Sequence, residues 1–144
     1  MKQIQLIKPG GLENISVCDV DVPMPKSDEV LIKVAASSLN YHDLLVALGA
    51  IPTDDKRVPL SDAAGEIIEV GSDVTEWKIG DHVMSVCFPN WQSGPPKYEL
   101  LSFIGDHEDG YATECIAIKA SAITRTPSNF DLKESATLPC AGLT

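Results

Sequence analysis

The chain has 144 residues, 44% hydrophobic and 22% charged, which suits one globular domain with a hydrophobic core. Its 21 acidic residues outnumber 11 basic ones, giving a formal net charge of −10. Such a surface repels phosphate backbones and anionic lipid, so we expect binding to neither nucleic acid nor membrane. The acidic surface favours solubility.

The cysteines indicate a reducing compartment. Cys18, Cys87, Cys115 and Cys140 show no C-x-x-C spacing, and no histidine stands near enough to complete a zinc finger. The amino-terminal segment lacks an apolar core of signal-peptide length, and no apolar run approaches a membrane span. We therefore expect a cytoplasmic protein with buried thiols.

The first half of the chain is predicted to hold three strands and one short helix. Alternating polarity predicts strands over residues 2–8 and 14–23, and a more apolar strand is expected over 29–39. The inward-facing residues of the second strand are expected to be Ile15, Val17, Val20 and Val22. At 40–49 the period becomes helical, with apolar positions at Leu44, Leu45 and Leu48 and a stop at Gly49.

The second half is predicted to be mostly strands and turns. Strands are expected over 63–74 and 78–86, with positive φ at the turn residues Gly71 and Gly80 and turn amides bound by Asp81. Residues 88–110 have no clean period, and a loop this long is usually functional or poorly ordered. Strand alternation returns over 111–127, and 129–139 is expected to form a short helix capped by Asn129 or Asp131. Many short strands with glycine and proline turns predict an all-β barrel or sandwich.

Two segments carry a resemblance to a known family. "PLSDAAGEIIEVGSDVTEWKIGDHV" resembles the signature of the medium-chain dehydrogenase/reductase superfamily in its amino-terminal GroES-like domain. "EVLIKVAASSLNYHDLLVALG" is similar to the strand and helix that precede it, and "TLPCAGLT" resembles the end of that domain. The resemblance implies a mainly β fold, a GroES-like partly open β-barrel with a few short helices, over residues 1–144.

The resemblance also implies a site without zinc. Zinc-type members hold a catalytic zinc with Cys, His and Cys, and these positions match Asn40, the Ser61–Asp62 pair and Cys140. An amide and a hydroxyl are poor zinc ligands, and a catalytic zinc needs about three protein ligands, so we expect no metal. The structural zinc lobe needs four close cysteines, whereas residues 86–115 offer only Cys87 and Cys115.

The pattern resembles the zinc-independent, quinone-oxidoreductase-like branch, which implies reduction of a small carbonyl, enone or quinone by NADPH or NADH. Without a Lewis acid, hydrogen bonds must polarise the substrate. By resemblance, the candidate catalytic residues are Asn40 as amide donor, Tyr41 as carbonyl donor, His42 as proton donor, and the Ser61–Asp62 pair.

Each candidate has an ordinary structural alternative. Asn40 is also a favoured helix cap, His42 can be a solvated histidine, and Tyr41 a buried phenol with some partner. Cys140 can be a packed thiol, and Asp43 is expected to be structural, bonding nearby backbone. Trp91 either walls the substrate pocket or anchors its long loop.

The resemblance places Asn40, Cys140 and Thr144 near the cofactor, although the chain contains no G-x-G-x-x-G. The Rossmann cofactor domain is expected to be absent, leaving a chain that is inactive alone and either a truncated product or a fragment. The apolar surface that this exposes predicts a homo-oligomer. A non-catalytic GroES-like protein-binding module is the alternative function, and a ring-forming co-chaperonin is a third.

Overall fold

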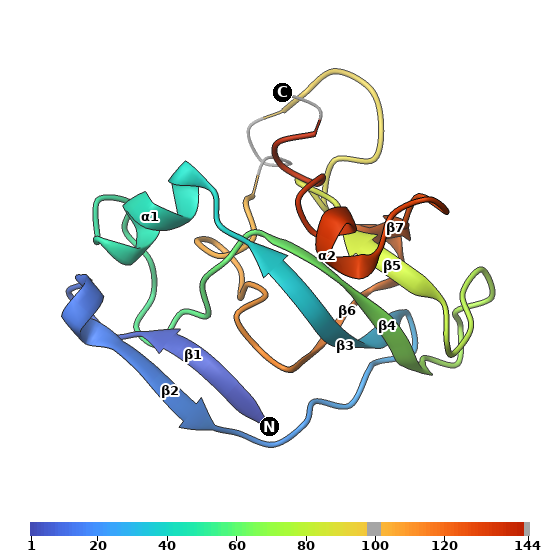
Figure 1. The fold of residues 1–144 in the computed structure, drawn as a ribbon, viewed down its shortest axis with the longest axis horizontal. Coiled ribbons are helices and arrows are strands. Elements are labelled where there is room, and N and C mark those ends of the chain that lie inside the picture. Colours follow the sequence, from blue (N-terminus) through green and yellow to red (C-terminus); the bar gives the residue numbers. More distant parts are fainter. Residues whose placement is uncertain (98–101, 143–144) are drawn as a thin grey trace.

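The computed structural model describes residues 1–97 and 102–142. In this part of the chain five antiparallel strands form a sheet in the order β6-β3-β4-β5-β7, and β1 and β2 pair separately (Figure 1). The predicted mainly β fold with open sheets and short helices is confirmed. The elements are β1 (Lys2–Leu6), β2 (Ile15–Asp19), β3 (Glu29–Ser38), α1 (Tyr41–Ala47), β4 (Asp62–Val70), β5 (His82–Ser85), β6 (Cys115–Lys119), β7 (Ile123–Arg125) and α2 (Leu132–Ser135), with 3-10 turns at Leu12–Asn14 and Ala120–Ala122.

The core lies on the β3–β4 pair. β3 reads as a nearly continuous apolar run because it is central, paired with β6 on one side and β4 on the other. Each fully buried valine or isoleucine contributes about 1.5–3 kcal/mol through removal of apolar surface from water. The buried cluster comprises Val30, Ile32, Ile67, Val83, Ala120 and Ile123.

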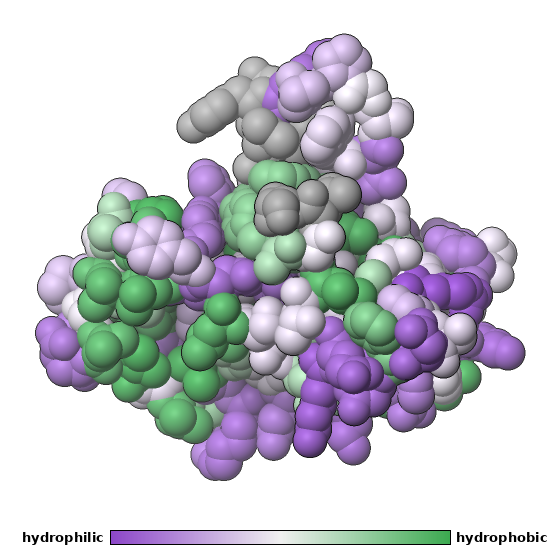
Figure 2. Space-filling view, turned by 45° about the horizontal axis from the view of Figure 1, so that its top comes forward, coloured by the Kyte–Doolittle hydropathy of each residue, from purple (hydrophilic) through white to green (hydrophobic). Residues whose placement is uncertain are grey.

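The predicted inward face of the second strand is wrong. Ile15 and Val17 are exposed, because that face of the β1–β2 pair is uncovered within the described residues. The strand ends at Asp19, so half-buried Val20 and exposed Val22 fall outside it. Figure 2 shows apolar side chains gathered on the side of the molecule that carries this hairpin and α1.

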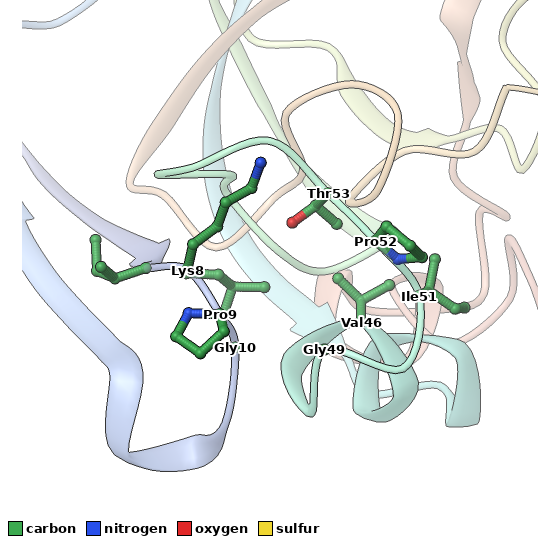
Figure 3. A pocket seen from close by; sticks show the side chains of 10 residues that line it. Lys8, Pro9, Gly10, Val46, Gly49, Ile51, Pro52 and Thr53 are labelled. Atoms are coloured by element: carbon green, nitrogen blue, oxygen red, sulfur yellow. The ribbon is translucent and has the colours of Figure 1, made fainter.

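The helix α1 is anchored at its carboxyl end by the tip of the β1–β2 hairpin. Gly11 N–H donates to the Ala47 carbonyl at 2.8 Å. A Cβ on Gly10 would lie 2.7 Å from the Gly49 Cα, so the two backbones meet only because both residues are glycine. Figure 3 shows this contact at the edge of a pocket whose other wall is Ile51–Thr53. The predicted helix is confirmed over Tyr41–Ala47, although Leu44 within it and its C-cap Leu48 are exposed.

The glycine turns were predicted with one error. Gly80 has φ of 90°, as a positive-φ turn requires, and Asp81 Oδ2 accepts from Lys78 N–H at 3.2 Å. Gly71 is not a positive-φ residue. It is needed for a different reason, because a Cβ there would lie 2.1 Å from the Lys26 carbonyl oxygen.

The carboxyl-terminal third positions the remaining site segments. The described residues of 88–110 form turns with one isolated bridge between Ile104 and Glu108, which agrees with the predicted loop. The predicted 111–127 strand is divided into β6 and β7 by the 3-10 turn. α2 is shorter than predicted, and its cap is Asp131, whose side chain accepts from Glu134 N–H.

Candidate functional site

A buried polar cluster lies where β3 ends and β4 begins. Ser38 closes β3, and the strand register pairs it with Asp62, the first residue of β4. Asn40 immediately precedes α1, so the turn out of β3 brings its side chain over the start of β4. Ser61 and Asp62 are almost completely buried. The structure therefore brings together three of the predicted catalytic residues, Asn40, Ser61 and Asp62.

The Asn40 amide is held by two acceptors. Its Nδ2 donates to Asp62 Oδ2 at 2.9 Å and to Ser61 Oγ at 3.0 Å. Because an ionised carboxylate only accepts, the hydrogen-bond network fixes which end of the amide faces Asp62. Both amide hydrogens are thereby used within the protein. The carbonyl oxygen Oδ1 faces the Asp43 backbone N–H in the capping box of α1, and its second lone pair is available to a bound molecule.

Asp43 ties the cluster to α1. Its Oδ2 accepts from the backbone N–H of Asn40 at 2.8 Å, which is one half of a capping box, and from Ser61 Oγ at 3.3 Å. The predicted structural role of Asp43 is confirmed by these bonds. Leu60, just before Ser61, has φ of 77°, a left-handed conformation that costs a non-glycine residue about 1–2 kcal/mol. Such strain is tolerated where surrounding contacts impose it, often at functional sites.

The Asp62 carboxylate is the electrostatic centre of the cluster. Burial raises the pKa of Asp62, and hydrogen bonds from Asn40, the Cys140 backbone and Ser38 oppose that rise. These donors all reach Oδ2, with Ser38 Oγ at 3.1 Å and Cys140 N at 3.3 Å. Oδ1 is buried with no hydrogen-bond partner among the described residues. Cys140 thus contacts the cluster through its backbone.

Two thiols lie beside this carboxylate. Burial, followed by the neighbouring Cys140 thiol and Asp62 carboxylate, raises the pKa of Cys87 to about 12. Burial followed by the Asp62 charge also raises the pKa of Cys140. None of the four cysteines, all within the described residues, forms a disulfide. The raised pKa values favour the packed-thiol interpretation of Cys140 over a nucleophile.

Aromatic rings of the long loop form a chain of contacts that reaches His42. The His42 and Phe103 ring centroids are 4.4 Å apart, Phe103 and Phe88 are 5.3 Å apart, and Phe88 and Trp91 are 6.4 Å apart. Trp91 also donates from Nε1 to the Gly94 carbonyl at 3.1 Å. Trp91, Phe88 and Cys87 line a pocket of about 550 Å³ with the 138–142 segment. Both predictions for Trp91, pocket wall and loop anchor, agree with this geometry.

Three predicted residues lie away from the cluster or outside the described residues. Tyr41 is 74% exposed and lines an apolar groove with Leu12, Ile15 and Leu44. His42 is directed toward Asp106 instead, with Nε2 to Oδ2 at 3.0 Å. Thr144 lies outside the described residues. The roles of Tyr41 and Thr144 stay predictions.

Sequence reasoning missed several members of the site. Ser38, Cys87 and Asp106 were not candidates. Cys87 and Asp106 reach the site from distant segments, and Ser38, two residues before Asn40, looked like an ordinary strand end. The "GDHEDG" run at 105–110 carried a signal, since it places two glycines around clustered acid and imidazole groups in a long loop.

The donor set at the cluster is unlike that of a zinc centre. Asn40 presents an amide nitrogen to Asp62, and Ser61 contributes a hydroxyl. Within the described residues, no group of three or more His, Cys, Asp or Glu side chains is arranged to hold a metal ion. Nor does this part of the chain contain a helix that could cross a bilayer.

Comparison with known proteins identifies the family. The alcohol dehydrogenase GroES-like domain family matches residues 26–128. A zinc-type alcohol dehydrogenase-like protein of Schizosaccharomyces pombe is 36% identical over 138 residues, which cover 93% of this chain and 40% of that protein. A chloroplast envelope quinone oxidoreductase homolog of Arabidopsis thaliana is 36% identical over 139 residues, covering 94% and 37%.

A solved structure shares the fold. A putative alcohol dehydrogenase from Sinorhizobium meliloti superposes with a TM-score of 0.88 and 28% identity, over 99% of this chain and 43% of that one. The chain thus spans about two fifths of the length of the relatives it matches. The family match, the relatives and the fold agree that this chain belongs to the alcohol dehydrogenase GroES-like domain family of the medium-chain dehydrogenase/reductase superfamily.

Proposed function

We propose that this chain is the substrate-side domain of a zinc-independent oxidoreductase that uses NADPH or NADH to reduce a small carbonyl, enone or quinone. The observation that carries the proposal is the Asn40–Ser61–Asp62 cluster at the start of α1, the helix that also carries His42. Buried carboxylates with a raised pKa and specific donors concentrate at functional sites. The oxidoreductase names of the relatives support the reaction class.

The proposed role of Asn40 is that of an oriented acceptor. Because Asp62 and Ser61 take both amide hydrogens, Asn40 can offer Oδ1 to an N–H or O–H donor of the cofactor or substrate. That favours the cofactor-contact role expected for Asn40 over amide donation to a carbonyl. The proton donor is His42, whose imidazole can supply a proton near neutral pH.

The proposal of a zinc-free site rests on donor chemistry. The amide nitrogen of Asn40 and the hydroxyl of Ser61 are already hydrogen-bonded to each other or to Asp62, and neither is a favoured zinc ligand. A zinc-type name among the relatives makes this a point to test. Zinc analysis of the purified chain by mass spectrometry should give well below one equivalent, and a stoichiometric tightly bound zinc would contradict the proposal.

The nicotinamide cofactor would supply a hydride when bound. Asn40, Cys140 and Thr144 are the residues proposed to face it, and the unpartnered Oδ1 of Asp62 is a further acceptor in the same cluster. Since the 144-residue sequence contains no G-x-G-x-x-G motif, we expect the dinucleotide to need a separate binding domain. We therefore expect no turnover by these 144 residues alone. Cytoplasmic location and homo-oligomerisation also stay predictions, testable by fractionation and light scattering.

A domain-fusion assay tests the function. The chain is joined in frame to the part of the Schizosaccharomyces pombe relative that lies outside the matched 138 residues, and NADPH and NADH oxidation is followed with a quinone and an enone. We expect activity in the fusion and background rates from the chain alone. A folded, NADPH-binding fusion with no activity toward any carbonyl, enone or quinone would favour the alternative, a non-catalytic protein-binding module.

A further inference from the structure

A second acid–base group lies outside the Asn40–Ser61–Asp62 cluster. The Asp106 side chain, only 4% exposed, stands between two imidazoles. Its Oδ2 lies 3.0 Å from His42 Nε2, and its Oδ1 lies 2.6 Å from His107 Nδ1. Oδ1 also accepts from the His107 backbone N–H. These contacts on Oδ1 fix the carboxylate so that Oδ2 is left for His42.

The surroundings of His42 Nε2 indicate which ring nitrogen carries the hydrogen in the neutral imidazole. This atom is buried, and the described residues offer it no well-directed hydrogen bond, so Asp106 at 3.0 Å is its nearest partner. Catalytic hydrogen bonds are often poorly aligned in ligand-free sites and tighten on binding. A bare Nε2 would set lone pair against lone pair, so Nε2 must carry a hydrogen.

The other carboxylates nearby have different partners. Asp43 is bound to Asn40 and Ser61, and Glu108 accepts from Asn90 and Ser102. Phe103 packs against the His42 ring without offering an acceptor. Asp106 is thus the carboxylate that can determine which of the two ring nitrogens of His42 carries the hydrogen.

We infer that Asp106 is a positioning residue that holds neutral His42 in its Nε2–H tautomer and so makes Nδ1 the atom that delivers the proton. The inference rests on the proposed function. In the reduction, hydride adds to the substrate carbon and NAD(P)H becomes NAD(P)⁺. The Nδ1–H of protonated His42 passes to the resulting anion, which leaves His42 neutral with its hydrogen still on Nε2.

The substitution Asp106→Asn separates charge from geometry. The Asn oxygen can keep the His107 N–H bond, which turns the amide N–H₂ toward His42 Nε2. A donor there favours the opposite neutral tautomer, with the hydrogen on Nδ1. Delivery of the Nδ1 proton by protonated His42 would then leave the Nε2–H tautomer, which D106N disfavours. The same logic makes the aspartate of a Ser-His-Asp triad a tautomer selector. Asp109→Asn is the matched control, since this exposed loop carboxylate binds Arg57 and the Val58 N–H and touches no histidine.

Long-range ¹H–¹⁵N correlation spectra of the labelled 144-residue chain test the inference without cofactor. We expect neutral His42 to be Nε2–H in the wild type and in D109N, and to shift to Nδ1–H in D106N. Wild-type His42 in the Nδ1–H form, or an unchanged tautomer in folded D106N, would overturn it. Should D106N fail to fold, the wild-type spectrum still decides.

Kinetics of the fusion supply the second readout. D106N should lower kcat by about 10²-fold, the scale of general acid catalysis, with little change in KM, whereas D109N should not. An inactive fusion with the expected tautomers would count against the proposed function alone. An active fusion with the wrong wild-type tautomer would count against the role of Asp106 alone.

Discussion

The two ends of the β3–β4 pair are built from different chemistry. At one end Val30 pairs with Val70 and Ile32 with Ile67, and these side chains join the apolar core. At the other end Ser38 pairs with Asp62, and the buried atoms are polar. The apolar end stabilises the fold through non-directional burial. The polar end must satisfy each buried group individually, and its net contribution to stability is small. This small net contribution agrees with the role in binding and chemistry that we propose for the polar end.

The largest effect is expected at the apolar end. Ile67→Ala removes a fully buried side chain and leaves a cavity, so the free energy of unfolding should fall by about 3 kcal/mol. Urea denaturation measures the loss, with Ile79→Ala, an exposed site, as the control. A loss equal to that of the control would mean that this cluster is not the core.

Asn40→Leu should have an intermediate, pH-dependent effect at the polar end. It deletes a hydrogen bond to a buried carboxylate, which costs about 2 kcal/mol near neutral pH. Protonating Asp62 lessens the need for that donor, so the loss should shrink in acid. Urea denaturation at several pH values checks this.

The matched control for that substitution is Asn14→Leu. Asn14 Nδ2 donates to the uncharged Gly10 carbonyl at 2.7 Å, so its loss should not vary with pH. Equal pH dependence in both variants would argue against a charged Asp62.

Asp62→Asn should reduce the pH dependence of the free energy of unfolding. Because burial raises the pKa of Asp62, the folded state binds its proton more tightly than the unfolded state. Stability from this group therefore falls as pH rises from about 3.9 through the raised folded pKa. D62N removes this fall and should be more stable than the wild type above that window, by on the order of 1 kcal/mol. Thermal unfolding from pH 4 to 8 measures the difference, and a gap that narrows with rising pH would contradict the sign.

The smallest structural perturbation is chemical modification of Cys87. With a pKa of about 12, its thiolate fraction at pH 8 is roughly 10⁻⁴, so alkylation should be about 10³-fold slower than in the denatured chain. Mass spectrometry of iodoacetamide-treated protein follows the rate at this residue. Rapid native alkylation at Cys87 would show that the thiol is not desolvated.

The contrast between the apolar and polar ends of the β3–β4 pair also explains which features could be predicted from the sequence. Alternation and glycine turns predicted the mainly β fold and α1, because apolar burial leaves a local periodic pattern. The same pattern was misleading at Ile15 and Val17, since alternation identifies a face without saying what covers it. Motif order brought Asn40, Ser61 and Asp62 together, whereas Asp106 pairs with His42 across 64 residues of chain and has no periodic signal.

The most direct test of the account is the rate of NAD(P)H-dependent quinone or enone reduction by the fusion, compared between the wild type and Asn40→Leu. Both proteins must first be shown to be folded and to bind NADPH. We predict that the wild-type fusion reduces the substrate and that N40L lowers kcat/KM by at least about 10²-fold. The substitution removes the Oδ1 acceptor and the Nδ2 hydrogen bond that positions Asp62. Equal rates in the two folded proteins would contradict the claim that the buried polar end of β3 and β4 carries the chemistry.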